Sequence, residues 1–303
     1  MKIAVIAGDG IGREVIPVAL SELPPDAEVI GLDVGAERYL STGELLTEQD
    51  TAVIRDCDAL LFGAIGDPRV PDGVLERGVL IELRRVLDVY VNLRPFPELG
   101  LVFVRENSEG LYAGVGDRSA DSATEVSVNT RTAIERCTRY AFELAQQRDG
   151  RLTWVHKTNV LVNAGGLWRD VVTLVAAEHP EVEVSYEHAD ACAYHLALDH
   201  GRYDVILTEN LFGDVLSDLA AALAGGLGLA ASANLHPDPA TRPSRCIGLF
   251  EPVHGSAPDI AGKGLADPTA AIRAARMLTD AVLQETEVGR ATGRSKRGTV
   301  TTV

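Results

Sequence analysis

Short apolar runs alternate along this chain with longer segments in which apolar residues recur every three or four positions. The short runs have the length and composition of buried strands, and the longer segments have the periodicity of amphipathic helices. Strands are predicted at residues 3–7, 59–62, 101–104, 152–155, 182–186 and 205–208, and helices at residues 130–147, 166–178 and 191–198. Alternation of strands with helices predicts an α/β protein with a mainly parallel sheet covered by helices.

The first predicted strand runs into the glycine-rich turn GDGIG at residues 8–12, and a helix-like segment follows it. A dinucleotide-binding fingerprint has this order, with a third glycine that allows close packing of helix on strand. Here Arg13 occupies the position of that third glycine, and Gly12 comes one residue early. The pattern leaves two possibilities open, an altered Rossmann loop or a different nucleotide site that also uses glycines.

Size, charge and cysteine content narrow the class of protein. The 303 residues suffice for two medium domains, and the net charge of −16 argues against a surface for nucleic acid or anionic membranes. The four cysteines form no CxxC pair, so neither structural zinc nor a disulfide scaffold is expected. No signal peptide or membrane span is visible. We therefore expect a cytoplasmic protein with reduced cysteines.

Asp214 and Asp218 lie four residues apart at the start of a predicted helix, so their carboxylates share one face. Like charges at this spacing repel unless water screens them or a cation lies between them. Hard divalent ions such as Mg²⁺ or Mn²⁺ prefer oxygen ligands of this kind. The apolar flanks and the alanine-rich continuation of the helix weigh against a simple solvated acidic face.

Three arginines, Arg84, Arg94 and Arg105, each lie at the edge of an apolar stretch. Because a guanidinium binds a carboxylate through two parallel hydrogen bonds, several arginines suit a substrate with two carboxylates. Tyr112 follows Arg105 by seven residues and is a candidate general acid, since nearby positive charge lowers the pKa of a phenol. Taken singly, the arginines also fit surface ion pairs, and the tyrosine also fits simple packing.

Lys157 and Asn159 come just after a predicted strand, and strand alternation would place them on one side. The lysine is either a proton carrier or a solvated charge. Asp190 begins a predicted helix, where it is either an N-cap or a third metal ligand. The loop at residues 254–259 offers backbone groups, a histidine ring and a carboxylate able to bind a ribose diol.

Taken together, these segments resemble the β-decarboxylating dehydrogenases, the family of 3-isopropylmalate, isocitrate, homoisocitrate and tartrate dehydrogenases. The matching blocks are GDGIG, NLRP, VREN, HKTNV, NLFGDVLSDLA and EPVHGSAPDIAGKG, in that order over about residues 1 to 280. The resemblance implies a two-domain α/β fold with a mainly parallel sheet, unlike the Rossmann fold. Residues 1–90 and 225–303 would form a discontinuous cofactor-binding domain, and residues 91–224 a substrate, metal and dimerisation domain.

The resemblance also implies a homodimer whose active sites lie between the domains and are shared by the subunits, with Lys157, Asn159 and Asp190 of each site coming from the partner subunit. Asp214 and Asp218 would hold Mg²⁺ or Mn²⁺ with Asp190 of the partner subunit. The catalytic residues implied are Tyr112, Lys157 and Asp190. Those implied for the substrate are Ile81, Arg84, Arg94, Arg105 and Asn159, and those for the cofactor are His254, Gly255, Ser256, Ala257, Asp259, Ile260 and Asp267.

The cofactor and the substrate can be predicted within the family. A carboxylate at Asp259 would bind the adenosine ribose hydroxyls and repel a 2′-phosphate, which favours NAD over NADP. Homoisocitrate enzymes carry a further arginine three residues before the equivalent of Arg84. Here Val79, Leu80 and Ile81 form a predicted apolar wall suited to an isopropyl group, since a carboxylate buried there would be costly.

The expected reaction is therefore oxidative decarboxylation of a 3-substituted malate, foremost 3-isopropylmalate to 4-methyl-2-oxopentanoate and CO₂, in leucine biosynthesis or a related pathway. Two alternatives stay open. The segment RENSEGLY, residues 105–112, is closer in sequence to the isocitrate and homoisocitrate branch of the family. Tartrate is a further possible substrate. An inactive homologue that serves as a binding subunit is the alternative of another class.

The chain departs from the family pattern at several positions. Arg13 stands where proline is usual, and Asp267 replaces an asparagine expected near the adenine. The last segment, residues 288–303, is rich in Gly, Ser, Thr, Lys and Arg, and we expect it to be frayed.

Overall fold

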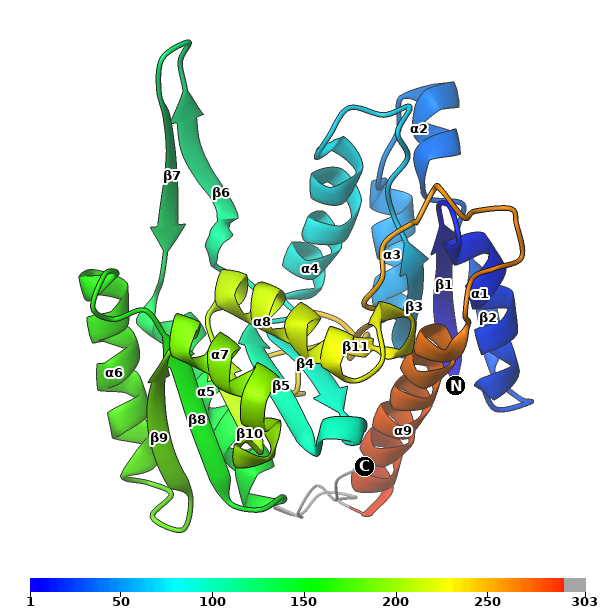
Figure 1. Ribbon diagram of the computed structural model, residues 1–303. Coiled ribbons are helices and arrows are strands. Elements are labelled where there is room, and N and C mark those ends of the chain that lie inside the picture. Colours follow the sequence, from blue (N-terminus) through cyan, green and yellow to red (C-terminus); the bar gives the residue numbers. More distant parts are fainter. Residues whose placement is uncertain (292–303) are drawn as a thin grey trace. The chain divides into compact units, whose positions relative to one another are not determined.

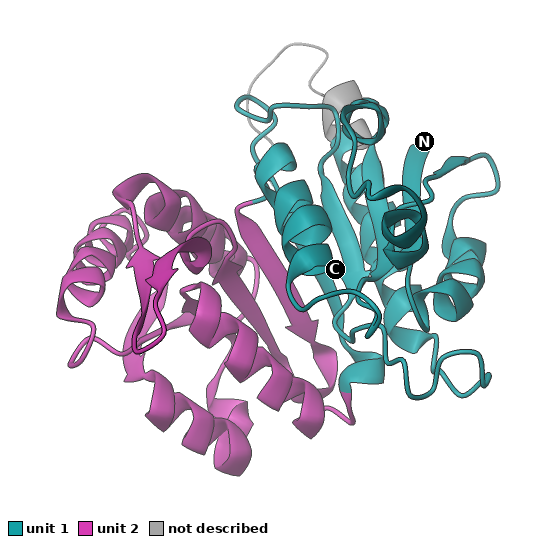
Figure 2. Cartoon of the chain, turned by 90° about the horizontal axis from the view of Figure 1, so that it is seen from above, with its two compact units in different colours: residues 1–89, 227–301, 303 teal, residues 90–226, 302 magenta. Residues whose placement is uncertain are grey.

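The computed structural model describes residues 1–291 of the chain. They fold into two compact units, one made of residues 1–89 and 227–291, the other made of residues 90–226 (Figure 2). None of the helices in the described part of the chain combines the length and the apolarity that crossing a membrane requires.

Unit 1 is built on strands in the order β2-β1-β3-β12-β11. Figure 1 labels β1, β2, β3 and β11 of these strands. These strands are β1 (Lys2–Gly8), β2 (Glu28–Gly31), β3 (Ala59–Ala64), β11 (Ala231–Leu235) and β12 (Gly248–Pro252). Strand β1 pairs in parallel with β2 and β3, β3 pairs in parallel with β12, and β11 is antiparallel to β12. A strand from the end of the chain thus lies beside strands from its beginning.

The helices of unit 1 include a π-helical turn. They are α1 (Gly12–Ala19), η1 (Leu20–Glu22), α2 (Ala36–Thr42), α3 (Glu48–Asp56), the π-turn η2 (Glu76–Ile81), α4 (Glu82–Leu87), η5 (Leu227–Leu229) and α9 (Thr269–Ala291). The π-turn runs directly into α4, and π-turns of this kind occur frequently at functional sites.

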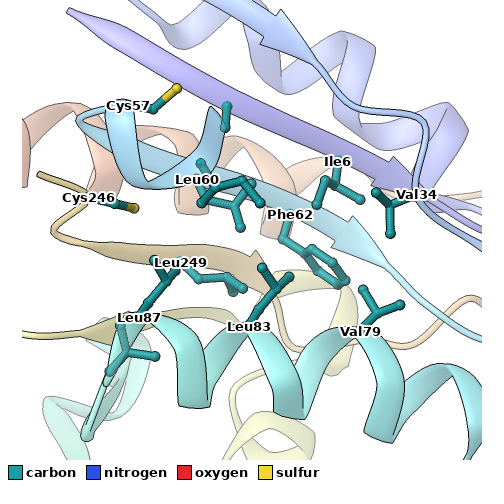
Figure 3. Packing of buried hydrophobic residues seen from close by; sticks show 13 residues of the cluster. Ile6, Val34, Cys57, Leu60, Phe62, Val79, Leu83, Leu87, Cys246 and Leu249 are labelled. Atoms are coloured by element: carbon teal, nitrogen blue, oxygen red, sulfur yellow. The ribbon is translucent and has the colours of Figure 1, made fainter. Parts of the chain in front are cut away.

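The core of unit 1 lies between β3 and α4. Leu60 and Phe62 of β3 pack against Leu83 and Leu87 of α4, and Leu249 of β12 joins them (Figure 3). Every residue of β3 is buried, which explains its continuous apolar sequence, because a parallel strand in the middle of a sheet is covered on both faces. This core fixes α4, the helix that carries Arg84.

Unit 2 has strands in the order β4-β5-β10-β8-β9 and a separate two-stranded hairpin, β6 with β7. The strands are β4 (Val91–Phe96), β5 (Leu101–Glu106), β6 (Gly110–Arg118), β7 (Ala123–Val128), β8 (Arg151–His156), β9 (Glu183–His188) and β10 (Val205–Thr208). The helices are η3 (Pro97–Leu99), α5 (Arg131–Gln146), α6 (Val162–Ala176), α7 (Ala189–Asp199), η4 (His200–Arg202) and α8 (Asn210–Leu223). Strand β4 is antiparallel to β5, whereas β5, β10, β8 and β9 are parallel.

The periodicity located the six predicted strands and the helices predicted at residues 130–147, 166–178 and 191–198, with shifts at their ends. The largest shift is in α6, which begins at Val162 rather than at residue 166. Gly165 lies in the first turn of α6, close to the loop before it. A Cβ on this residue would come within 2.8 Å of Thr158 Cα, so the glycine allows this close contact.

Several elements were not predicted. Strands β2, β4, β6, β7, β11 and β12 were not among the strands predicted from the apolar runs. At the carboxyl end, α9 continues to Ala291, so residues 288–291 are helical rather than frayed. The rest of the segment predicted to be frayed, residues 292–303, lies outside the described residues.

Candidate active site

The parallel strands of unit 2 explain why so many candidate residues lie along one edge of its sheet. Parallel strands end at the same edge, and ligands of α/β proteins bind outside their carboxyl ends. Arg105 is the penultimate residue of β5, and Lys157 directly follows β8. Asp190 follows β9, and α8, which carries Asp214 and Asp218, follows β10.

The carboxylates of Asp214 and Asp218 lie on one face of α8, as their spacing predicted. The helix is capped by Glu209, whose carboxylate accepts hydrogen bonds from the backbone N–H of Phe212 at 2.7 Å and of Leu211 at 3.1 Å. Side-chain exposure is 35% for Asp214 and 51% for Asp218, so both reach solvent. The pair is therefore accessible to a ligand.

Two arginines face this carboxylate pair. Arg94 donates to Asp214 Oδ1 at 3.1 Å and to Asp218 Oδ1 at 3.2 Å, and Arg105 donates to Asp214 as well. Asn92 lies directly opposite Arg105 in the β4–β5 ladder, and Arg94 lies two residues further along β4, so these side chains share one face of the sheet. Both arginines are almost completely buried, which rules out a simple surface ion pair.

Each buried guanidinium is held by further hydrogen bonds. Arg105 donates twice to Asn210 Oδ1, at 3.0 and 2.7 Å. Arg94 donates to Asn92 Oδ1 at 2.9 Å and to Ser217 Oγ at 2.7 Å. Charges buried in this way are preorganised, because the protein has already removed their water and fixed their direction.

Tyr112, from strand β6, donates a hydrogen bond to Asp214 Oδ2 at 2.6 Å, and the Arg105 guanidinium lies 5.0 Å from its ring centroid. The expectation of a lowered pKa for Tyr112 is wrong in direction. Burial raises the pKa of the phenol, and its hydrogen bond to Asp214 adds to this, which outweighs the lowering by Arg105. The raised pKa keeps the phenol protonated at neutral pH, as a general acid requires.

The carboxylate pair has the donor chemistry of a Mg²⁺ or Mn²⁺ site, since both groups are hard oxygen ligands. Burial raises the pKa of the Asp218 carboxyl, with Asp214 adding to the shift and Arg94 opposing it. Among the described residues, no three His, Cys, Asp or Glu side chains cluster closely enough to hold a metal. Asp190 therefore does not join Asp214 and Asp218 within one chain, and the shared-dimer ligand set remains a prediction.

Lys157 and Asp190 form an ion pair of their own, with Lys157 Nζ 2.5 Å from Asp190 Oδ1. The hydrogen bond from Lys157 holds the pKa of the Asp190 carboxyl below its usual value. Asp190 is the second residue of α7, and His188 occupies the N-cap position, so the N-cap alternative is wrong. Asn159 is exposed in the same loop as Lys157.

Sequence reasoning missed Tyr186, which holds the loop on both sides of Lys157. Its hydroxyl accepts a hydrogen bond from Thr158 N at 3.2 Å and lies 2.8 Å from Thr158 Oγ1. It also lies 3.2 Å from the carbonyl oxygen of His156 and 2.7 Å from His188 Nδ1. The signal would have been the register of β8 with β9, which no local pattern reveals.

Arg84 and Ile81 belong to unit 1. Arg84 is 9% exposed, and its Nη2 lies 3.4 Å from Glu251 Oε1. Ile81 is the half-buried last residue of the π-turn. The predicted apolar wall is wrong for Val79, which is fully buried in the core of unit 1 (Figure 3), and Leu80 packs against that core.

The predicted cofactor loop also belongs to unit 1 and connects β12 to α9. Ala257 adopts a φ of +41°, a conformation uncommon for a residue with a side chain. His254 Nδ1 lies 3.0 Å from the carbonyl of Gly255, Ser256 is buried, and Ile260 N donates to Ala257 O at 3.1 Å.

The two aspartates of this loop are both exposed, but their roles differ. Asp267 accepts a hydrogen bond from Thr269 N at 2.9 Å, at the start of α9. This contact with Thr269 lowers the pKa of Asp267 and gives the departure from the family asparagine a structural role. Asp259 is left as the carboxylate available to a ribose.

Comparison with known proteins decides the family. The sequence matches the family model described as Isocitrate/isopropylmalate dehydrogenase over residues 2–301. The chain belongs to this family of dehydrogenases. Its resemblance to the β-decarboxylating dehydrogenases is thereby confirmed.

Individual relatives agree with this assignment. The chain is 54% identical over 300 residues to the 3-isopropylmalate dehydrogenase of Corynebacterium efficiens, covering 92% of this chain and 87% of that protein. The structure of isocitrate dehydrogenase from Methylococcus capsulatus matches with a TM-score of 0.82 at 34% identity, covering 98% of this chain and 96% of that one. A β-decarboxylating dehydrogenase from Thermococcus kodakarensis matches with a TM-score of 0.77 at 40% identity, over 96% and 86% of the two chains. These matches confirm the predicted fold class.

Proposed function

We propose that this family member catalyses the NAD-dependent and Mg²⁺- or Mn²⁺-dependent oxidative decarboxylation of 3-isopropylmalate in the cytoplasm. The observation that carries the proposal is the cluster in which Asp214 accepts hydrogen bonds from Arg94, Arg105 and Tyr112 beside Asp218. The relatives with 52–54% identity that carry the name 3-isopropylmalate dehydrogenase favour this substrate over isocitrate, homoisocitrate or tartrate. The four cysteines are free and buried, in keeping with a reducing compartment.

The proposed roles follow from charge and proton position. Arg84, Arg94 and Arg105 bind the two carboxylates of the malate. Lys157 of the partner subunit is paired with Asp190 of the same subunit. It passes its ammonium proton to Asp190 and then, as a neutral amine, accepts the proton of the substrate hydroxyl while the hydride leaves carbon 2 for NAD. The 3-carboxylate then departs as CO₂, and Tyr112 delivers a proton to carbon 3.

The two cofactors supply the remaining chemistry. Asp214 and Asp218, with Asp190 of the partner subunit, would hold the divalent ion. When bound, the ion stabilises negative charge on the oxygen at carbon 2, and NAD takes up the hydride. Asp259 would bind the ribose diol, and the other residues of the cofactor set, His254, Gly255, Ser256, Ala257, Ile260 and Asp267, would line the adenosine.

A homodimer with shared active sites is part of the proposal. One chain offers two carboxylates for the metal among its described residues, and a third would come from a second copy. Helices α7 and α8 also expose apolar side chains, with Tyr194 62%, Leu198 66% and Val215 62% exposed. Apolar side chains gathered on two helices that contact each other suit a surface that a partner covers.

The first experiment follows NADH absorbance with 3-isopropylmalate. We expect turnover with Mg²⁺ or Mn²⁺, none with a chelator, and little with NADP. Asp214→Asn should abolish turnover. Turnover without a divalent ion, or a preference for isocitrate, homoisocitrate or tartrate in the same panel, contradicts the proposal.

Subunit complementation tests the shared site. Lys157→Ala and Asp214→Asn homodimers should each be inactive, and co-expression should restore part of the activity. In the mixed dimer one site receives both intact residues if they come from different subunits. A mixed dimer without activity contradicts sharing.

A further inference from the structure

The amino-terminal glycine block and the predicted cofactor loop meet within unit 1, although about 250 residues separate them. Gly10 has a φ of +51°, and a Cβ there would lie 2.0 Å from the carbonyl oxygen of Ser256. The next residue, Ile11, donates its backbone N–H to that same oxygen at 2.9 Å. Gly10 therefore allows a close backbone contact between the glycine block and the cofactor loop.

Glu14 makes a second contact, further along the same loop. Its two carboxylate oxygens accept hydrogen bonds from Gly262 N at 2.6 Å and from Gly264 N at 3.2 Å. Both glycines adopt positive φ angles, +76° and +64°. A left-handed backbone needs little strain at glycine, so the loop can turn both N–H groups toward one carboxylate.

Arg13 fixes the turn from which Glu14 projects. Its Nε donates to the carbonyl oxygen of Gly8 at 3.0 Å, and Gly8 has a φ of +72°. A proline at this position could not make that contact. Arg13 thus stabilises the glycine turn, and the neighbouring Glu14 holds the cofactor loop.

Asp259 lies close to the residues that Glu14 holds. The segment from Ala257 to Lys263 is a series of tight turns, with Lys263 N donating to Ile260 O at 3.2 Å and Lys263 Nζ to Asp259 O at 2.6 Å. These bonds shape the turn locally, whereas the contacts with Ile11 and Glu14 attach it to the rest of unit 1. A loop attached in this way loses less conformational freedom when a ligand binds.

We propose that Glu14 is a positioning residue for the dinucleotide, because it anchors the turn that presents the Asp259 carboxylate to the adenosine ribose. The inference rests on the proposed function, since it assumes that Asp259 meets NAD. In the structure Glu14 contacts the backbone of the loop. Its effect should therefore fall on cofactor affinity and leave the chemical step unchanged.

The test compares Glu14→Gln with the wild-type protein by calorimetric titration of NAD and of AMP, and by steady-state kinetics. We expect NAD and AMP to bind about fivefold more weakly, the fold-change that corresponds to one lost hydrogen bond. The KM for 3-isopropylmalate and kcat at saturating NAD should change less than twofold. The matched control is Glu22→Gln, which removes a nearby acid that pairs with Arg276 instead of the loop.

The direction of the change in NAD and AMP affinity distinguishes a positioning role of Glu14 from a simple effect of its charge. NAD and AMP carry phosphates, so removal of a negative charge by itself would strengthen their binding. Unchanged or tighter binding in Glu14→Gln overturns the inference while the proposed function stands. A wild-type protein that binds neither NAD nor AMP overturns the proposed function itself, and the inference with it.

Discussion

Tyr112 donates its phenolic hydrogen bond to Asp214 Oδ2 over 2.6 Å. This contact directs the acidic proton of the hairpin residue toward the helix that carries the carboxylate pair. It also couples the group proposed to protonate carbon 3 to a group proposed to bind the metal. A change at either one should alter the other.

Tyr112→Phe removes the proposed general acid and leaves the ring beside Arg105. We expect kcat to fall by about a hundredfold, in the range of general acid catalysis, with a much smaller change in the KM for 3-isopropylmalate. Tyr39→Phe, a half-buried tyrosine of unit 1, is the control. An unchanged kcat would assign the proton to another group.

Tyr186→Phe removes the hydroxyl that holds the residues on both sides of Lys157. The ring, 4.3 Å from Trp154, should keep its packing. We expect kcat to fall about five- to tenfold with little change in KM, because the loop loses hydrogen bonds and Lys157 loses its fixed direction. Steady-state kinetics of the purified variant measures both constants.

A double-mutant cycle with Thr158→Val sharpens this prediction. The single variants should each lower kcat, and the double variant should lower it little beyond Tyr186→Phe, because Tyr186→Phe already removes the contact with Thr158 Oγ1 that Thr158→Val removes. Thr158→Ser should behave like the wild type. Ser185→Ala is the control on the same strand, since the serine hydroxyl contacts Thr153. Fully additive losses in kcat would contradict a shared role.

Ile81→Arg, at the end of the π-turn, tests whether Ile81 contacts the isopropyl group of the substrate. A buried cation next to an isopropyl group is costly, so we expect the kcat/KM for 3-isopropylmalate to fall at least about a hundredfold. Activity on homoisocitrate should fall less or rise. Leu40→Arg, on an exposed position of α2, controls for the added charge. Equal or better activity on 3-isopropylmalate would show that Ile81 does not face the alkyl group.

His156 makes the fold sensitive to acid. His156 is 1% exposed, and burial lowers its pKa to about 4. In the unfolded chain this histidine becomes protonated near pH 6.5, whereas in the folded chain it becomes protonated only near pH 4. The stability of the fold therefore decreases as the pH falls from about 6.5 to about 4. Between pH 7 and pH 5 this group should lower the free energy of unfolding by about 2 kcal/mol.

His156→Phe should remove that share of the acid sensitivity, since Trp168 and Phe212 already surround the ring. Urea denaturation of both proteins at pH 7 and pH 5 measures it. The variant should lose less stability on acidification than the wild type. An equal loss in both would show that other groups account for the acid response.

Local sequence predicted those parts of the site that depend on one element. The four-residue spacing of Asp214 and Asp218 was enough to place them on one face of a helix. The meeting of Arg94 with Asp214 could not be derived in this way, because it depends on the pairing of β4 with β5 and on the crossing of α8, which distant residues decide. The same reason explains why Tyr186 was missed.

Burial was harder to predict than position. Val79 and Ile81 lie two residues apart in an apolar run, yet the π-turn directs one into the core and leaves the other half-exposed. The pKa of Tyr112 was predicted from nearby positive charge, whereas desolvation is the largest contribution to its shift. Arg13 and Asp267 differ from the family pattern, and no role for either could be predicted from the sequence. The structure shows that Arg13 donates a hydrogen bond to Gly8 and that Asp267 accepts one from Thr269.

The insertion of β12 beside β3 has a consequence for biosynthesis. Unit 2 is continuous in sequence, so its strands can pair as soon as residues 90–226 have been translated. Strand β3 must wait for residues 248–252, and until then its fully apolar edge has no partner of its own sheet on that side. Unpaired apolar edges promote aggregation. The nascent chain is therefore exposed to aggregation at β3 until residues 248–252 have been translated, and the pairing of β12 with β3 ends that exposure.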